Sequence, residues 1–507
     1  MKTITTHNPE FLSATMQVAR GPLRAFKGTL RALWGGLLLP LAVVLLPLTI
    51  ALLAAACSST KDEGGFAPGE FKEWAPTPPM GWNSWDCYGP TVTEAEVRAN
   101  ADFMARHLKA YGWEYVVVDI RWYVANDHAG GYNQTDPVYS LDEWGRYTPA
   151  TNRFPSAEGG AGFAPLAEYI HSLGLKMGIH IMRGIPRAAV DGRMPILGAD
   201  DITADQVASS DQLCTWLSDN YTINPDRPGA QAYYNSLMDL YASWGVDFIK
   251  IDDMSRPYHK GEIELVRHAI DRCGRPIVLS LSPGETPDSE AAHVSEHANM
   301  WRMVDDLWDQ WDDVTHLMDV AERWYDHIQP GTWPDGDMLP LGHIAIRGER
   351  GEDRQSLLNA HEARSLVSLL CAIRSPLMMG GDLPTTDSLT LSLLTNPAVL
   401  EMHRVATDIR PLYHENDRLL ITSRHPDTGD LYLAAFNLGN HDYLRLRLTP
   451  QELGLGEGVW VPTDLWTGEV LSPVGAGLPR RSRTFNPAIY PHACGLYRFT
   501  QAQELGQ

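Results

Sequence analysis

Short apolar segments alternate with amphipathic helical segments along most of this chain, and this alternation restricts its fold more than any other feature. Each apolar segment is too short for a helix and is rich in β-branched residues, as buried parallel strands are. The sequence predicts eight such strands, at residues 80–83, 115–119, 176–181, 247–252, 276–282, 301–306, 338–341 and 377–380.

Eight strand–helix units in succession predict a (β/α)8 barrel. A doubly wound sheet is the competing fold, but the Gly-x-Gly-x-x-Gly turn that often follows its first strand is missing here. Beyond residue 410, short strands follow one another without helices, which predicts a C-terminal antiparallel β-sandwich. The predicted fold is therefore α/β, with a barrel at residues 77–408 and a sandwich at residues 409–507.

The N-terminus has the pattern of an export signal. Five basic residues precede an uncharged stretch at residues 32–56. The ending Leu-Ala-Ala-Ala-Cys resembles a bacterial lipoprotein signal, in which Cys57 becomes the lipidated first residue. An uncleaved membrane anchor and a plain signal peptide are the alternatives. All three place the protein body outside the cytoplasm. The predicted organisation is a lipoprotein-type signal peptide over residues 1–56 and a tether over residues 57–76, with the exported body in the periplasm or at the cell surface and attached to a membrane only through its N-terminus.

Composition restricts the partners of this protein. A formal charge of -22 argues against nucleic acid, whose phosphates require a basic surface. The 16 tryptophans and 19 tyrosines suit a carbohydrate substrate, although such residues also fill a large core. The scattered cysteines have no metal-ligand spacing, and the sequence implies no metal or organic cofactor. The sequence leaves the oligomeric state open.

Carboxylates end several of the predicted strands. Asp119, Asp252 and Asp306 each close an apolar segment, and Lys250 lies two residues before Asp252, so that both side chains face one way. Because active sites of barrels lie at the carboxyl ends of the strands, these groups are expected to meet there. Two carboxylates with cationic neighbours are what cleavage of a glycosidic bond requires. His180, Ser282 and Arg302 also fall at strand ends.

Four motifs in order resemble glycoside hydrolase family 27, the family of α-galactosidases and α-N-acetylgalactosaminidases. They are residues 78–85, the strand with Lys250 and Asp252, Trp301-Arg302 followed by Asp306, and residues 333–339. The resemblance runs from about Pro78 to Phe499 and implies a (β/α)8 barrel with a C-terminal β-sandwich.

The resemblance implies a retaining mechanism, with Asp252 as the nucleophile and Asp306 as the general acid/base. Lys250 is expected to favour the carboxylate form of Asp252. The family spacing selects Asp306 over Asp305, which is expected to point to the opposite side of the strand, as Asp253 does from Asp252. The resemblance also implies substrate-binding positions at Trp85, Asp119, Arg302, Asp337 and Met338. His180 replaces a family tyrosine and is a further candidate.

Two departures from the family pattern concern the sugar. Ile120 and Arg121 follow Asp119, where α-galactosidases have a second aspartate for the 4- and 6-hydroxyl edge. Ser282 stands where they have a glutamate facing the 2-hydroxyl, and a serine there resembles the N-acetylgalactosaminidase arrangement. The disulfides of the family cannot form here, because Arg121 and Met254 stand at the partner positions of Cys87 and Cys214.

The predicted function is retaining exo-hydrolysis that releases terminal α-D-galactose or a close relative. β-L-Arabinopyranosides share the ring configuration of α-D-galactosides and lack only the C6 group, so a β-L-arabinopyranosidase is one alternative; an α-N-acetylgalactosaminidase is another. A non-catalytic glycan-binding lipoprotein is the alternative from another class. The joint presence of Asp252, Lys250, Arg302 and Asp306 argues against it, since a binder has no use for a general acid.

Overall fold

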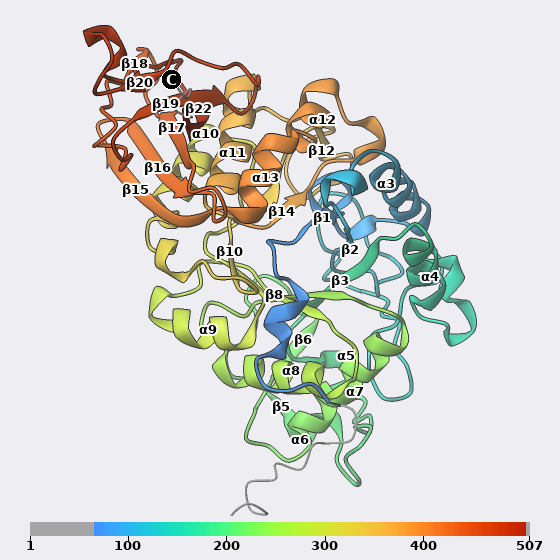
Figure 1. Cartoon of the computed structure of the whole chain (residues 1–507). Coiled ribbons are helices and arrows are strands. Elements are labelled where there is room, and N and C mark those ends of the chain that lie inside the picture. Colours follow the sequence, from blue (N-terminus) through green and yellow to red (C-terminus); the bar gives the residue numbers. More distant parts are fainter. Residues whose placement is uncertain (1–64, 503–507) are drawn as a thin grey trace, which may run out of the picture. The chain divides into compact units, whose positions relative to one another are not determined.

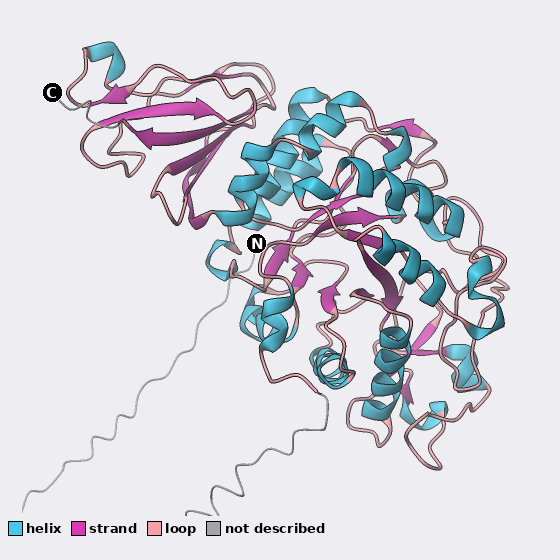
Figure 2. Ribbon diagram, turned by 45° about the vertical axis from the view of Figure 1, so that its right-hand side comes forward, coloured by secondary structure: helices cyan, strands magenta, loops and turns pink. Residues whose placement is uncertain are grey.

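The computed structural model describes residues 65–502. Its centre is a parallel sheet of nine strands, with helices around the outside (Figures 1 and 2). The strands lie in the order β10 (Trp333–Asp335), β9 (Met300–Arg302), β8 (Val278–Leu281), β7 (Phe248–Asp252), β3 (Lys176–Met182), β2 (Tyr115–Val118), β1 (Met80–Asn83), β14 (Leu377–Met379) and β11 (Met338–Leu339).

The two ends of this sheet are neighbouring segments of the chain. β10 pairs with β9, and β11 pairs with β14. Between them, Asp337 has a φ of 78°, and a Cβ atom on Gly336 would lie 2.6 Å from Leu370, so the strand is kinked where a helix packs against it. The kink lets one strand close the barrel, and the predicted (β/α)8 fold is confirmed. The first half of the kinked strand, β10, was not among the predicted strands.

Side chains alternate between the barrel interior and the surrounding helices. On β2, Tyr115 and Val117 face the interior cluster, while Val116 and Val118 join the larger core under the helices. On β7, Phe248 faces the interior and Ile249 faces outwards. Because strand side chains repeat every second residue, Lys250 and Asp252 share the inward direction of Phe248.

The helices of eight or more residues lie largely where the 3.6-residue pattern predicts them. Capping boxes at Thr93 and Asn359 fix the starts of α3 and α11. The helical pattern of the sequence continues from residue 314 to residue 328, but α10 ends at Ala321 and a 3-10 turn follows at Tyr325–His327. These helices are α3 (Glu94–His107), α4 (Ala164–Ser172), α7 (Ala230–Ser243), α8 (Lys260–Arg272), α10 (Trp311–Ala321), α11 (Ala360–Ala372) and α13 (Pro397–Val405).

The shorter helices include α2 (Trp85–Tyr88), whose four residues are buried, α5 (Arg187–Asp191), α9 (Ala291–His297) and α12 (Ser388–Leu394). The strand predicted at residues 301–306 ends at Arg302. Asp305 and Asp306 therefore lie in the loop after β9, where strand alternation does not apply.

The C-terminal part is antiparallel, as predicted, and begins at Thr407. Along β16, Leu419 and Ile421 join the core shared with the barrel, while Leu420 joins a second core on the other face. Ser365 of α11 donates a hydrogen bond to the carbonyl oxygen of His492, 2.7 Å away. The main sheet has the order β15 (Thr407–Glu415), β16 (Arg418–Arg424), β17 (Leu431–Asn437), β22 (Cys494–Gln501), β19 (Val459–Asp464) and β20 (Val474–Gly475), beside a two-stranded sheet of β18 (Leu444–Arg445) and β21 (Ala488–Ile489).

The described part of the predicted tether packs on the barrel instead of standing free. Residues Glu70–Trp74 form a 3-10 helix, and Phe71 is buried. The guanidinium of Arg267 lies 4.7 Å from the centre of the Phe71 ring. The aromatic side chains at residues 66, 71 and 74 give this segment apolar area to bury. The prediction of a tether followed its Gly and Pro content instead.

The predicted signal and Cys57 lie outside the described residues. Within residues 65–502, no helix combines the length and the apolar character needed to cross a membrane.

Candidate active site

A pocket of about 560 Å³ opens at the carboxyl ends of the barrel strands. Arg302 and Asp337 do not line it but lie behind its wall. The predicted site residues that line it are Trp85, Asp119, His180, Lys250, Asp252, Ser282, Asp306 and Met338.

Asp252 is the last residue of β7, and its carboxylate is buried in the pocket wall. His180 Nε2 lies 3.1 Å from Asp252 Oδ2, and the backbone N–H of Asp253 donates to Asp252 Oδ1 at 2.9 Å. Lys250 was expected to be the cation beside Asp252, but its Nζ atom contacts Asp119 Oδ2 at 3.6 Å. Because β3 and β7 are in register, with His180 opposite Lys250, the histidine reaches Asp252 from the neighbouring strand.

Asp119 follows β2 and joins the two cations. His180 Nδ1 lies 2.7 Å from Asp119 Oδ1, and Asn83 Nδ2 donates to Asp119 Oδ2 at 2.8 Å. Burial raises the pKa of Asp119, but the charges of His180 and Lys250 outweigh it, so that the pKa is well below its usual value. Burial lowers the pKa of His180, but Asp119 and Asp252 outweigh that effect and raise it. The group therefore favours an imidazolium between two carboxylates.

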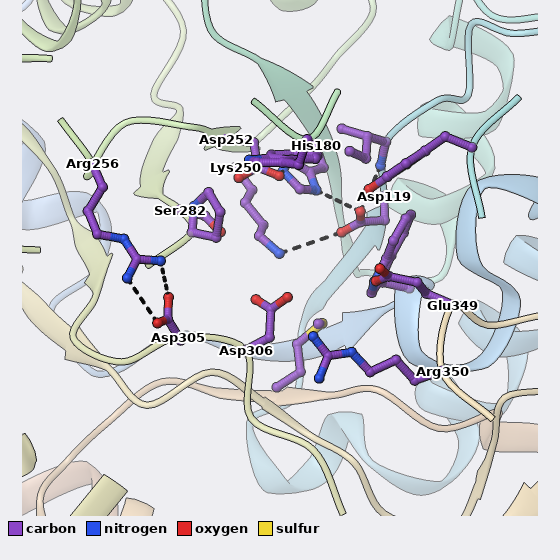
Figure 3. A pocket seen from close by; sticks show the side chains of 16 residues that line it. Asp119, His180, Lys250, Asp252, Arg256, Ser282, Asp305, Asp306, Glu349 and Arg350 are labelled. Atoms are coloured by element: carbon purple, nitrogen blue, oxygen red, sulfur yellow. Dashed lines mark hydrogen bonds and ion pairs between the residues drawn. The ribbon is translucent and has the colours of Figure 1, made fainter. Parts of the chain in front are cut away.

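Asp306 approaches the pocket from another side, from the loop after β9 (Figure 3). Its Oδ1 lies 3.2 Å from a terminal nitrogen of Arg302, and its side chain is 42% exposed. The other terminal nitrogen of Arg302 lies 2.8 Å from Asp337 Oδ1. Burial and the charge of Asp306 raise the pKa of Asp337 to about 6, although the charge of Arg302 acts to lower it. One guanidinium thus serves two carboxylates, of which only Asp306 reaches the pocket.

Asp305 also lines the pocket, at its rim, where it forms an ion pair with Arg256 (Figure 3). The expectation that Asp305 points away from the site is therefore wrong, because β9 ends before it. Asp253 does turn away from the site: its carboxylate lies 2.7 Å from Arg183, which also contacts Glu262.

Loops supply pocket residues that the sequence did not single out. Trp85 stacks on Tyr132 with ring centres 5.5 Å apart, and Tyr132 lies 6.0 Å from Trp216. Glu349 and Arg350 enter from the loop between β12 (His343–Ile344) and β13 (Arg354–Gln355). Tyr132 and Trp216 lie in the long connections that follow β2 and β3, and nothing in the sequence distinguishes them from core aromatics.

The two departures from the family pattern both lie in the pocket. Ile120 is 1% exposed and forms part of its wall. Ser282 follows β8, is equally buried, and its Oγ atom has no hydrogen-bond partner among the described residues. A buried hydroxyl without a partner is costly, so it suits a site that a polar ligand completes.

Arg121 does not replace the missing aspartate. Its side chain is fully buried away from the pocket, with ion pairs of 3.0 Å to Asp127 and 2.9 Å to Asp219. The five cysteines among the described residues are free thiols, as the failed disulfide pattern predicts.

Comparisons with known proteins agree with this geometry. The family model described as Alpha galactosidase A (Melibiase_2) matches residues 218–404. The crystal structure of a family 27 β-L-arabinopyranosidase from Geobacillus stearothermophilus superposes with a TM-score of 0.83 and 46% identity, covering 87% of this chain and all of that one.

Two curated relatives are more distant in sequence. An α-galactosidase of Cyamopsis tetragonoloba is 27% identical over 84% of this chain and 86% of the relative. An α-N-acetylgalactosaminidase of Mus musculus is 26% identical over 78% of this chain and 85% of the relative.

Proposed function

The chain belongs to glycoside hydrolase family 27 and acts on O-glycosyl bonds, and from this premise we propose that it releases terminal β-L-arabinopyranose from glycans with retention of configuration. The observation that carries the choice of sugar is Ile120, an apolar side chain in the pocket wall directly after Asp119.

The sugar assignment depends on what Ile120 can and cannot do. In the family pattern this position carries a carboxylate for the 4- and 6-hydroxyl edge of galactose. An isoleucine accepts no hydrogen bond, so a 6-hydroxyl held there loses its partner, which costs about 1–3 kcal/mol. Arabinopyranose has no C6 group, so it has no 6-hydroxyl contact to lose, and the loss of the 4-hydroxyl contact is common to both sugars. The 46% identity with a β-L-arabinopyranosidase supports the same choice.

Asp252 is the proposed nucleophile. Its carboxylate accepts a backbone hydrogen bond from Asp253 and lies beside the His180 ring, and both contacts hold it in the pocket wall. Asp252 attacks the anomeric carbon, the bond to the leaving oxygen breaks, and a covalent glycosyl-enzyme forms.

Asp306 is the proposed general acid/base. It gives its proton to the leaving oxygen in the first step and takes one from the attacking water in the second, which frees Asp252. Arg302, held from behind by Asp337, contacts Asp306 and stabilises it each time it becomes negative. Asp252→Asn and Asp306→Asn should each remove most turnover and leave the fold intact.

Terminal α-D-galactosides are the second candidate, because Glu349 brings a carboxylate into the same pocket. Burial raises the pKa of Glu349, against the effect of Arg350. If Glu349 holds a 6-hydroxyl, Glu349→Gln lowers kcat/KM for the galactoside and spares that for the arabinoside.

The test is a panel of matched nitrophenyl glycosides, namely β-L-arabinopyranoside, α-D-galactoside and 2-acetamido-2-deoxy-α-D-galactoside. We expect the highest kcat/KM for the arabinopyranoside. The NMR spectrum should show that the sugar is first released with the same anomeric configuration as the substrate. A higher kcat/KM for the galactoside would reject the sugar assignment, and release of the opposite anomer would reject the mechanism. Ser282→Glu should suppress any activity on the acetamido sugar, since it fills the space near C2.

A further inference from the structure

Two histidines and a glutamate come together on helices α8 and α9, apart from the pocket. Glu264 lies on α8, and His293 and His297 lie one turn apart on α9. One potential ligand atom from each of the three lies within 4.8 Å of the others. The two imidazole rings stack, with centres 4.1 Å apart. None of the three lines the pocket.

The second nitrogen of each ring already has a partner. His297 Nδ1 lies 2.7 Å from the backbone oxygen of His293. Since a carbonyl oxygen only accepts, Nδ1 carries the proton and Nε2 keeps a free lone pair. His293 Nδ1 lies 2.7 Å from the hydroxyl of Tyr258, and its Nε2 lies 3.2 Å from Glu264 Oε1. Histidines that bind metal are supported in this way, because the partner of one ring nitrogen orients the other.

The electrostatics also suit a cation from outside. Glu264 brings a carboxylate to the two rings, with Oε1 3.2 Å from His293 Nε2, and a carboxylate is an accepted ligand of zinc. Glu264 is half exposed, with 51% of its side chain accessible, so an ion can enter and keep water ligands.

We propose that Glu264, His293 and His297 bind a zinc ion at a site outside the active site. Two imidazole nitrogens and one carboxylate oxygen are a ligand set that zinc accepts, with water at the remaining position. The ion ties α8 to α9. Through Tyr258 it also steadies the segment after β7 that carries Arg256 at the pocket rim.

The first experiment is a titration of ZnCl2 into the full chain after treatment with chelator, followed by calorimetry. We expect one ion per chain and a higher melting temperature. His293→Ala and His297→Ala should each weaken zinc binding by more than about 100-fold, and Tyr258→Phe by about 10-fold, the effect of a lost supporting group.

His414→Ala is the matched control. His414 is similarly buried and lies between two carboxylates, 3.2 Å from Asp319 and 3.4 Å from Glu322. Neither of these two contacts is with a histidine. Its loss should leave zinc affinity unchanged. Unchanged affinity in both His293→Ala and His297→Ala, or no binding by the parent chain, would overturn the proposal.

X-ray absorption at the zinc edge keeps the proposal testable if a variant fails to fold. The parent protein with one equivalent of zinc should show scattering from two imidazole rings. A shell of oxygen ligands alone would place the ion at carboxylates elsewhere and reject this site.

Discussion

His180 Nε2 lies 3.1 Å from Asp252 Oδ2, which makes this histidine the direct cationic neighbour of the proposed nucleophile. The same ring contacts Asp119 at 2.7 Å through Nδ1. Lys250, two residues before Asp252 on the same strand, contacts Asp119 and supports Asp252 from a greater distance. We therefore propose that His180 is a positioning residue that acts through Asp252. It lies on β3, which neighbours β7 in the sheet but not in the sequence.

Replacement of His180 by glutamine should lower kcat/KM by about 10- to 100-fold, because a charged contact contributes about 1.5–3 kcal/mol. The pKa of His180 is raised, so the imidazolium persists to a higher pH than usual and is lost as pH rises through that value. The alkaline limb of the wild-type pH–rate profile should therefore change in His180→Gln.

His171→Gln is the control for that experiment. His171 also contacts an aspartate, Asp247, at 2.7 Å, but outside the pocket. Steady-state kinetics should not distinguish it from the parent enzyme. Equal losses in both variants would mean that the His180 effect is a general one on folding.

Ile120→Asp should raise activity on α-D-galactosides relative to β-L-arabinopyranosides by about 10- to 100-fold, since it restores a charged acceptor for the 6-hydroxyl. The ratio of the two kcat/KM values is the measurement, because a fraction of unfolded protein lowers both values by the same factor. Ile120→Val, which keeps the wall apolar, should leave the ratio unchanged. A fall in the ratio for Ile120→Asp would show that another group meets C6.

His259 makes stability depend on pH. Burial, with the nearby charge of Arg183, lowers the pKa of His259 to about 3. The stability linked to this depressed pKa is present above about pH 6.5 and is lost as pH falls towards 3, because the unfolded chain takes up the proton first. At pH 4.5 this loss is about 2–3 kcal/mol.

Denaturant unfolding at pH 7.5 and at pH 4.5 measures the effect. The free energy of unfolding should fall less between these two pH values in His259→Gln than in the parent chain. Identical decreases in both proteins would contradict the assignment.

Export and lipid anchoring at Cys57 remain our proposal from the sequence. Cys57→Ser should release the protein from membranes or block processing of the signal, because the lipid is the proposed stable anchor. Membrane fractionation of the two proteins, with sizing of the N-terminus, is the measurement. Unchanged fractionation with residues 1–56 still attached would favour a spanning anchor.

The barrel could be predicted from the sequence because its signals are local. Apolar runs such as the one ending at Asp252 and capping patterns such as Asn359 with Glu362 specify strands and helices through neighbours in the chain. The split strand was harder, because the kink at Gly336 depends on close packing of Leu370 from α11.

The site was predictable only in part, for the same reason. Residues at strand ends, such as Asp119 and Asp252, converge wherever a parallel barrel forms. The partners within the site depend on strand order, so that His180 rather than Lys250 contacts Asp252. Loop residues such as Tyr132 and Glu349 reach the pocket through long-range folding of irregular segments, for which no sequence periodicity exists.

Covalent trapping tests the central claim most directly. A 2-deoxy-2-fluoro-β-L-arabinopyranosyl fluoride slows both steps and lets the glycosyl-enzyme accumulate. After proteolysis, mass spectrometry should find the sugar on the peptide that contains Asp252, with fragmentation assigning it to that residue, and Asp252→Asn should take up no label. A label on Asp306, Asp305 or Glu349 would contradict the account. So would a parent enzyme that the reagent fails to inactivate.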